Sequence, residues 1–168
     1  YALVEDDRKG RFDRERAEEL GVPVGPKFST LHNGESVELE DGTVVDPEQV
    51  VGKPRPGRSI VYTGDTRPTA ATIEAADEPD LLIHDATFAD DMAQRAADTA
   101  HSTARQAAEI ANRAGATRLA LLHISSRYAG YADDHERQAR DVFAGDGENL
   151  SVPDDGQKLE IPYPDAET

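Results

Sequence analysis

The chain has no cysteine and no tryptophan, and only 5% of its 168 residues are aromatic. Without cysteine, these residues can form neither disulfide bonds nor thiolate metal sites, so a metal here would need histidine and carboxylate ligands. No stretch approaches the roughly 20 consecutive apolar residues of a membrane-spanning helix. We therefore expect no contact with a membrane, and the length fits one domain with a modest core.

Basic residues are scarce, and lysine is the scarcest of them. The chain carries 34 acidic and 18 basic side chains, only 4 of which are lysine, and its formal net charge is −16. Acid-rich, lysine-poor surfaces are typical of proteins that stay soluble in very high salt, where charge repulsion is screened. We expect the cytoplasm of a halophile; an acidic protein of an ordinary organism is the alternative. The apolar runs are too regular for a disordered acidic chain.

The first part of the chain, residues 1–55, predicts a small unit made of a helix and a hairpin. It opens with YALVEDD, which is typical of a strand running into an acidic turn, and this opening suggests a fragment of a longer protein. Residues 13–20 predict a helix that is capped by its first residue. GVPVGP at 21–26 then ends the helix in a rigid loop, because proline restricts the backbone. Asp41-Gly42 predicts the turn of a hairpin.

The remainder, residues 56–168, predicts an α/β layer. Nearly continuous apolar runs, typical of strands in a buried sheet, alternate with helical segments. The predicted strands are 59–63, 81–87 and 118–125, and the predicted helices are 69–76, 101–114 and 133–143. Small alanine residues recur on one face of the second helix, which favours close packing on the sheet. Two shorter segments, GENLSV and QKLEIP, predict closing strands.

Polar side chains gather where the predicted strands end. Asp65 follows the first strand, His84 and His123 lie in the other two, and His101 opens the second helix. In α/β layers, ligands and metals collect at the strand ends, and histidine and aspartate suit a divalent metal. One such histidine alone is more often structural, but the four residues together favour a metal site.

A catalytic metal usually needs three protein ligands, and a two-metal centre needs a bridging carboxylate. Asp65 fits the bridge and His123 a terminal imidazole ligand. Either His84 and His101 complete the site, or the other ligands lie upstream of this sequence. The two remaining histidines have polar neighbours and are expected at the surface: His32 and His135.

Five motifs occur in an order that resembles one family. They are GRFDRERAEELGVPVGPKF, GDT, HDAT, HST and HISSRY. This order is similar to ribonuclease Z, the tRNA 3′-processing endonuclease of the metallo-β-lactamase superfamily, over residues 1–130. The resemblance implies an αββα sandwich of which residues 56–168 are the C-terminal half, with the N-terminal half outside this sequence. It also implies that residues 1–55 hold a flanking strand and an inserted helix-hairpin arm that binds tRNA.

The resemblance implies a role for each matching residue of the site. Asp65 of GDT matches an aspartate that bridges two zinc ions, and His123 of HISSRY matches a ligand of one zinc. His101 of HST matches the histidine that assists proton transfer at the leaving oxygen. Asp85 of HDAT stands where the family has the glutamate that pairs with this histidine. Since aspartate is one methylene shorter, the pairing distance becomes a question for the structure.

The resemblance also implies contacts with the substrate. Arg127 matches an arginine near the substrate phosphate, and Gly25 and Pro26 belong to the GVPVGP part of the arm that holds the tRNA elbow. The family's HxHxDH motif, which supplies most zinc ligands and the general base, is not present. The match begins just downstream of the place where that motif would lie.

Taken together, the resemblance implies a zinc-dependent endoribonuclease that removes the 3′ trailer from precursor tRNA and leaves a 3′-OH on the tRNA. Such an enzyme holds two zinc ions and forms a homodimer. One alternative is a non-catalytic RNA-binding fragment that uses a local group of cations: Lys53, Arg55, Arg58 and Arg67. Another is an arylsulfatase-like hydrolase of the same superfamily, which would share Asp65 and His123 but would lack the GVPVGP arm and HST.

The acidic surface predicts that stability depends on salt. At low ionic strength the excess of acidic side chains repels over long distances, and salt screens this repulsion. We expect thermal melts in low and in molar KCl to differ by many degrees, with the higher melting temperature in KCl. Equal melting temperatures would contradict the halophilic interpretation.

Overall fold

The computed structural model describes residues 1–130 and 132–164, and the chain forms two compact units. Of the described residues, the α/β unit contains 1–5 and those from 58 to 164, and the arm unit contains 6–57. The sequence predicts a single boundary near residue 55. The first five residues group with the α/β unit because their strand is hydrogen-bonded to a strand that begins at Ser59.

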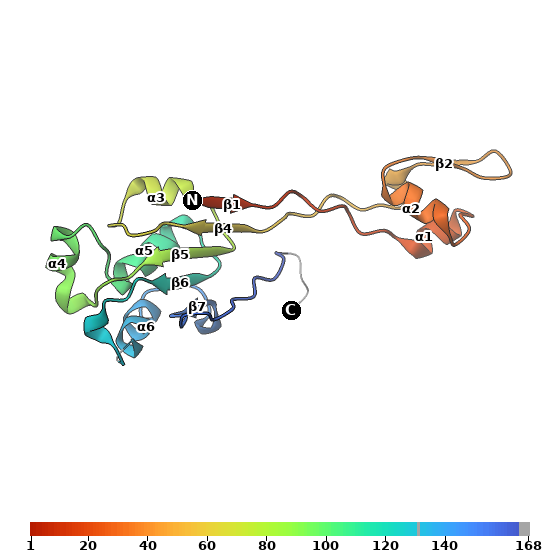
Figure 1. Ribbon diagram of the computed structural model, residues 1–168. Helices are drawn as coiled ribbons and strands as arrows, with labels where there is room; N and C mark the ends of the chain where they lie inside the picture. Colours follow the sequence, from red (N-terminus) through yellow and green to blue (C-terminus); the bar gives the residue numbers. More distant parts are fainter. Residues whose placement is uncertain (131, 165–168) are drawn as a thin grey trace. The chain divides into compact units, whose positions relative to one another are not determined.

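The α/β unit is built on one mixed sheet with the strand order β1-β4-β5-β6-β7 (Figure 1). Its strands are β1 Ala2–Val4, β4 Ser59–Tyr62, β5 Leu81–Asp85, β6 Leu119–Leu122 and β7 Leu150–Ser151. β1 is antiparallel to β4, and the other neighbours are parallel. The three long apolar runs and GENLSV thus form strands as predicted.

QKLEIP forms no strand, contrary to the prediction. Two of its backbone carbonyls instead accept hydrogen bonds from arginines that immediately precede β6 and β4. Arg118 Nη1 donates to the carbonyl of Glu160 at 2.9 Å, and Arg58 Nη1 donates to that of Ile161 at 3.0 Å. Side-chain hydrogen bonds therefore hold this segment in place of a strand partner. The alternation of apolar and polar residues in the sequence does not show this difference.

One face of the sheet packs against helices. These are α3 Ala70–Ala75, α5 Ala104–Ala114 and α6 Asp133–Arg140. The strand register places Val61, Leu82, Leu119 and Leu150 side by side on this face, and all four belong to the buried core. A further short helix, α4 Ala93–Asp98, was not predicted, because its six residues bury only one side chain and show no apolar period.

Helix α5 packs closely on the sheet because its buried stripe consists of small side chains. Its buried alanines are Ala104, Ala107, Ala108, Ala111 and Ala114. A capping box begins the helix: the Thr103 hydroxyl accepts from Gln106 N, and the Gln106 side chain accepts from Thr103 N. Gly115, with a φ of 69°, ends it in the left-handed conformation. At 11 residues it is far short of the length needed to cross a membrane, and no described helix meets that requirement.

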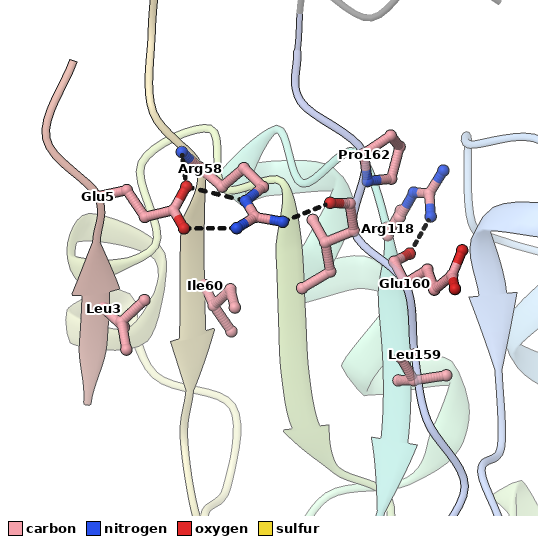
Figure 2. Close-up of a pocket in the computed structure, with 9 residues that line it drawn as sticks. Leu3, Glu5, Arg58, Ile60, Arg118, Leu159, Glu160 and Pro162 are labelled. Carbon is pink, nitrogen blue, oxygen red and sulfur yellow. Dashed lines mark hydrogen bonds and ion pairs between the residues drawn. The ribbon is translucent and has the colours of Figure 1, made fainter. Parts of the chain in front are cut away.

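The opposite face of the sheet is more open. Leu3 lies opposite Ile60 in the register and is 59% exposed, and both line a hollow at this face (Figure 2). Arg58 lies across the same hollow and donates two hydrogen bonds to the Glu5 carboxylate, at 2.8 and 2.5 Å. The sheet therefore has one fully packed face and one with apolar side chains accessible to solvent.

The arm unit has a small core of its own. Its helices are α1 Arg14–Glu19 and α2 Pro26–His32, its strands β2 Val37–Glu38 and β3 Val44–Val45. The predicted cap and hairpin are confirmed: Asp13 accepts from Arg16 N, and Gly42 has a φ of 83° in the turn. GVPVGP ends differently from the prediction, because Pro26 begins a helix instead of closing a loop. Proline is favoured at that first position, where its missing N–H costs no hydrogen bond.

Two backbone segments of the arm unit, residues 8–12 and 51–55, lie antiparallel to each other. Arg8 pairs with Arg55, and Phe12 with Val51. Between these pairs the backbones approach so closely that a Cβ on Gly10 would lie 1.9 Å from the Gly52 carbonyl oxygen. Only glycine fits there.

Short 3₁₀ helices also occur in the described residues of both units: η1 Pro47–Gln49, η2 Asp90–Met92, η3 Ser126–Tyr128 and η4 Gly147–Asn149.

Candidate metal and catalytic site

The polar residues predicted at strand ends meet at one edge of the sheet. Strands β4, β5 and β6 are parallel, so the chain leaves all three at the same edge. Gly64 and His123 adopt left-handed backbone conformations, with φ of 67° and 63°. These conformations turn the chain sharply after β4 and β6. Glycine adopts this region freely, whereas for histidine it is uncommon and carries strain.

Asp65, His101 and His123 form the one cluster of metal-ligand side chains found among the described residues. Each offers one ligand atom, and these atoms lie within 4.8 Å of one another. His123 Nε2 lies 3.4 Å from Asp65 Oδ2, and the two imidazole rings are stacked with centroids 5.0 Å apart. The Asp65 and His123 side chains are 59% and 47% exposed, so the cluster is open to solvent. One carboxylate and two imidazoles suit zinc.

Asp85 lies beneath this cluster and is 2% exposed. Its Oδ2 accepts from Thr66 N at 3.0 Å and lies 2.7 Å from His101 Nδ1. Its Oδ1 accepts from Thr87 N at 2.8 Å and from the Thr87 hydroxyl at 2.6 Å. Aspartate therefore reaches His101 at normal hydrogen-bond distance, which answers the question of the missing methylene.

Thr87 is a residue of this site that the sequence analysis did not single out. Besides its bond to Asp85, its Oγ1 lies 3.0 Å from His101 Nδ1 and 2.7 Å from His123 Nδ1. It is the last residue of HDAT, so its place in that motif was the available signal. A single threonine hydroxyl has no period or charge that would mark it otherwise.

His84 stands apart from the cluster. The register pairs it with Leu121 on the helix-covered face, where it is fully buried. Its Nδ1 lies 2.8 Å from the Asp85 carbonyl oxygen, and its Nε2 has no partner in the described part of the chain. Burial lowers the pKa of the His84 imidazole. Of the two candidates that the sequence left open, His101 therefore joins Asp65 and His123, whereas His84 does not.

His135 was expected at the surface, and that prediction is wrong. The side chain is 0% exposed, and neither ring nitrogen has a partner in the described residues. The imidazole ring packs edge-on against the Tyr128 ring, and the two ring centroids lie 4.5 Å apart. The acidic first turn of α6 suggested solvent, but His135 lies on the face of that helix that packs inward. Burial lowers its pKa, and the nearby Thr87 backbone offsets this in part.

His32 is half-buried, and it too differs from the expected surface residue. Its Nε2 lies 3.0 Å from the Gly10 carbonyl oxygen, and its ring packs beside Phe12. Helix α2, which carries His32, was not predicted, so no periodic pattern marked an inward face there.

The expected substrate residues lie in different units. Arg127 is exposed on η3, four residues after His123, in the same unit as the cluster. Gly25 and Pro26 are exposed at the start of α2 in the arm unit. Gly25 has a φ of 153°, and a Cβ there would meet nothing within 4 Å. Glycine is therefore needed at this position for its backbone conformation, and not because a neighbouring group packs closely against it.

The sequence is similar to a known protein family and to named proteins. Residues 15–124 match the Beta-lactamase superfamily domain. The chain is 69% identical over 165 residues to a protein called Ribonuclease Z from Natronomonas pharaonis, and 65% identical over 167 residues to one of that name from Halorubrum lacusprofundi. These matches cover 98% and 99% of this chain and 53% of each relative, so the chain spans about half the length of the curated relatives it matches.

A solved structure agrees with the fold. The crystal structure of the metallo-beta-lactamase fold protein YhfI from Bacillus subtilis is similar with a TM-score of 0.50 and 26% identity. The similarity covers 66% of this chain and 39% of that chain.

The buried His135 predicts a loss of stability in acid. Its folded-state pKa lies below the ordinary 6.5, so the unfolded chain binds the extra proton first as the pH falls. The contribution of neutral His135 to the free energy of unfolding is therefore complete above pH 6.5, and it decreases as the pH falls from 6.5 toward the folded-state pKa. We expect His135→Leu to reduce the pH dependence of the free energy of unfolding between pH 7.5 and 5, measured by urea titration. An unchanged slope would contradict a neutral buried ring.

Proposed function

The chain belongs to the beta-lactamase superfamily, and we propose that it forms part of a zinc-dependent endoribonuclease that removes the 3′ trailer from precursor tRNA. The observation that carries the proposal is the cluster of Asp65, His101 and His123 with the buried Asp85 behind His101. Its support comes from relatives called ribonuclease Z at 65–69% identity over nearly the whole chain.

The cluster supplies only part of a two-metal centre. Of the three clustered side chains, only Asp65 and His123 act as ligands in this proposal, whereas one catalytic ion usually needs three protein ligands and a pair of ions needs more. The relatives are about twice as long as the matched region. In this proposal the remaining ligands and the general base come from the part of the full-length protein that the chain does not cover.

Each side chain of the site receives a role in this proposal. Asp65 and His123 would hold the metal, Asp65 as the carboxylate shared by two ions and His123 as a ligand of one of them. Zinc, when bound, supplies Lewis acidity at the phosphodiester. His101, when it is protonated on both ring nitrogens, gives its Nε2 proton to the leaving oxygen, which is the 3′ oxygen of the tRNA when the product keeps its 3′-OH. Asp85 accepts the Nδ1–H of His101 and so keeps the other ring nitrogen turned toward the substrate.

Contacts with the tRNA complete the proposal. Arg127, exposed on the same unit as the cluster, is suited to a substrate phosphate. The arm unit, with Gly25 and Pro26 exposed at the start of α2, holds the body of the tRNA. The proposal includes a homodimer, which rests on the family resemblance alone, and the cytoplasm of a halophile, which the acidic composition and the haloarchaeal relatives support. A purely RNA-holding role is less well supported, because Arg58 of the basic group is paired with Glu5.

Two substitutions in the full-length protein test the metal site. Asp65→Ala should abolish trailer cleavage and lower bound zinc, because a bridging carboxylate contributes to both ions. His101→Ala should keep its zinc and cleave about 10²–10⁴-fold more slowly, the usual share of general acid–base catalysis. Zinc content is measured by plasma mass spectrometry and cleavage with a precursor tRNA that carries a 3′ trailer. Loss of zinc in His101→Ala would make His101 a ligand instead, and full activity of Asp65→Ala would end the proposal.

Removal of the arm tests its role in substrate binding. We replace residues 10–52 with a short glycine-serine linker in the full-length protein, which keeps the pairing of Arg8 with Arg55. KM for precursor tRNA should rise sharply, because the body of the tRNA loses its contacts. Hydrolysis of bis(p-nitrophenyl) phosphate, which needs only the metal centre, should persist. Loss of both activities, with zinc bound and the fold intact, would rule out a substrate arm.

A further inference from the structure

We propose that Thr87 is a positioning residue that sets the tautomer of His123. In this inference its hydroxyl accepts the Nδ1 proton of His123 and leaves Nε2 of that ring free to bind a metal ion. The inference deepens the proposed function and rests on it for the identity of the metal. The assignment of the protons, however, follows from the geometry of the described residues alone.

The argument starts from the short contact between Asp85 and Thr87. A carboxylate only accepts hydrogen bonds, and Asp85 Oδ1 lies 2.6 Å from Thr87 Oγ1. At that distance a proton must lie between the two oxygens, or their lone pairs would repel. The threonine hydroxyl has one proton, so it donates to Asp85. Thr87 Oγ1 can then only accept from its other neighbours.

This result decides the state of both imidazoles. His123 Nδ1 lies 2.7 Å from Thr87 Oγ1, so Nδ1 carries the proton and donates to the hydroxyl oxygen. His101 Nδ1 lies between Asp85 Oδ2 at 2.7 Å and Thr87 Oγ1 at 3.0 Å, both of which accept. It therefore also carries a proton. In each neutral ring the lone pair is on Nε2, and in His123 that atom faces Asp65 at 3.4 Å.

The backbone holds Thr87 firmly in this position. Its N–H donates to the same carboxylate oxygen, at 2.8 Å, and its carbonyl accepts from Ser125 N at 3.1 Å. The residue is only 6% exposed, so water has little access to it. The Ser125 contact ties the loop after β6 to the loop after β5. A histidine ligand that donates its other N–H to a fixed acceptor is oriented and made more basic, and loss of such a partner typically weakens metal binding about 10–100-fold.

The first experiment needs neither a metal nor a variant. The full-length protein is labelled with [¹⁵N]histidine, freed of metal, and studied by long-range ¹⁵N–¹H NMR at neutral pH, where the two tautomers give distinct ¹⁵N shifts. His123 is assigned by comparison with His123→Gln. We expect His123 to be protonated on Nδ1. Protonation on Nε2 in the wild-type protein would overturn the inference, whatever any variant does.

Substitutions of Thr87 test the consequence for metal binding. Thr87→Val removes the hydroxyl and keeps nearly the same shape, whereas Thr87→Ser keeps the hydroxyl. Thr117→Val, at an exposed threonine of the same unit, is the matched control. We expect Thr87→Val to weaken zinc binding about 10–100-fold in competition with a chelator and to shift His123 toward Nε2–H. Thr87→Ser and Thr117→Val should resemble the wild type.

The outcomes separate this inference from the proposed function. Wild-type zinc affinity and an Nδ1–H on His123 in a folded Thr87→Val would overturn the role of Thr87 and leave the endonuclease proposal untouched. Failure of Thr87→Ser to restore both readouts would show that packing, and not the hydroxyl, matters. A wild-type protein without zinc binding would end the proposed function, while the tautomer of His123 would still decide the role of Thr87.

Discussion

The site depends on one buried carboxylate. Asp85, at the end of β5, accepts from Thr66 N of the loop after β4 and from Thr87 N of its own loop, and it binds His101 in the loop that precedes α5. These groups come from three segments that are distant in the sequence. A buried charge is costly unless its hydrogen-bonding capacity is filled, so the segments are held in the one arrangement that fills it.

Further contacts reinforce the same arrangement. The Ser102 hydroxyl donates to the Thr66 carbonyl at 2.7 Å, and Phe88 pairs with Thr103 as a short parallel bridge. The loops that carry the cluster are thus cross-linked below it, whereas the ligand atoms of Asp65 and His123 remain open to solvent. Rigid support with exposed ligands is what a metal centre requires, because the ligands must be positioned before the ion arrives and an open position must remain.

The acidic composition raises a physical question for a protein that binds nucleic acid. With a net charge of −16, the long-range field repels a polyanion and attracts metal ions. High salt screens the repulsion and also weakens contacts with phosphate. For a tRNA substrate, affinity would therefore rest on short-range fit, and the separate arm unit with its own core is the part of the chain suited to provide it.

The sequence by itself determined the strands, the packing helix α5 and the positions of Asp65, His101 and His123 at strand ends, because apolar runs, alanine spacing and motif order are local patterns. It failed for α2, α4 and QKLEIP, which are too short or too dependent on side-chain contacts to show a period. Only the tertiary structure decided which histidines meet. The side chain of His84 lies on the helix-covered face of the sheet, and that of His135 is buried. The hydroxyl of Thr87 lies within hydrogen-bond distance of both imidazoles of the site. Those outcomes depend on register and on contacts between segments far apart in the chain, and no window of sequence contains both partners.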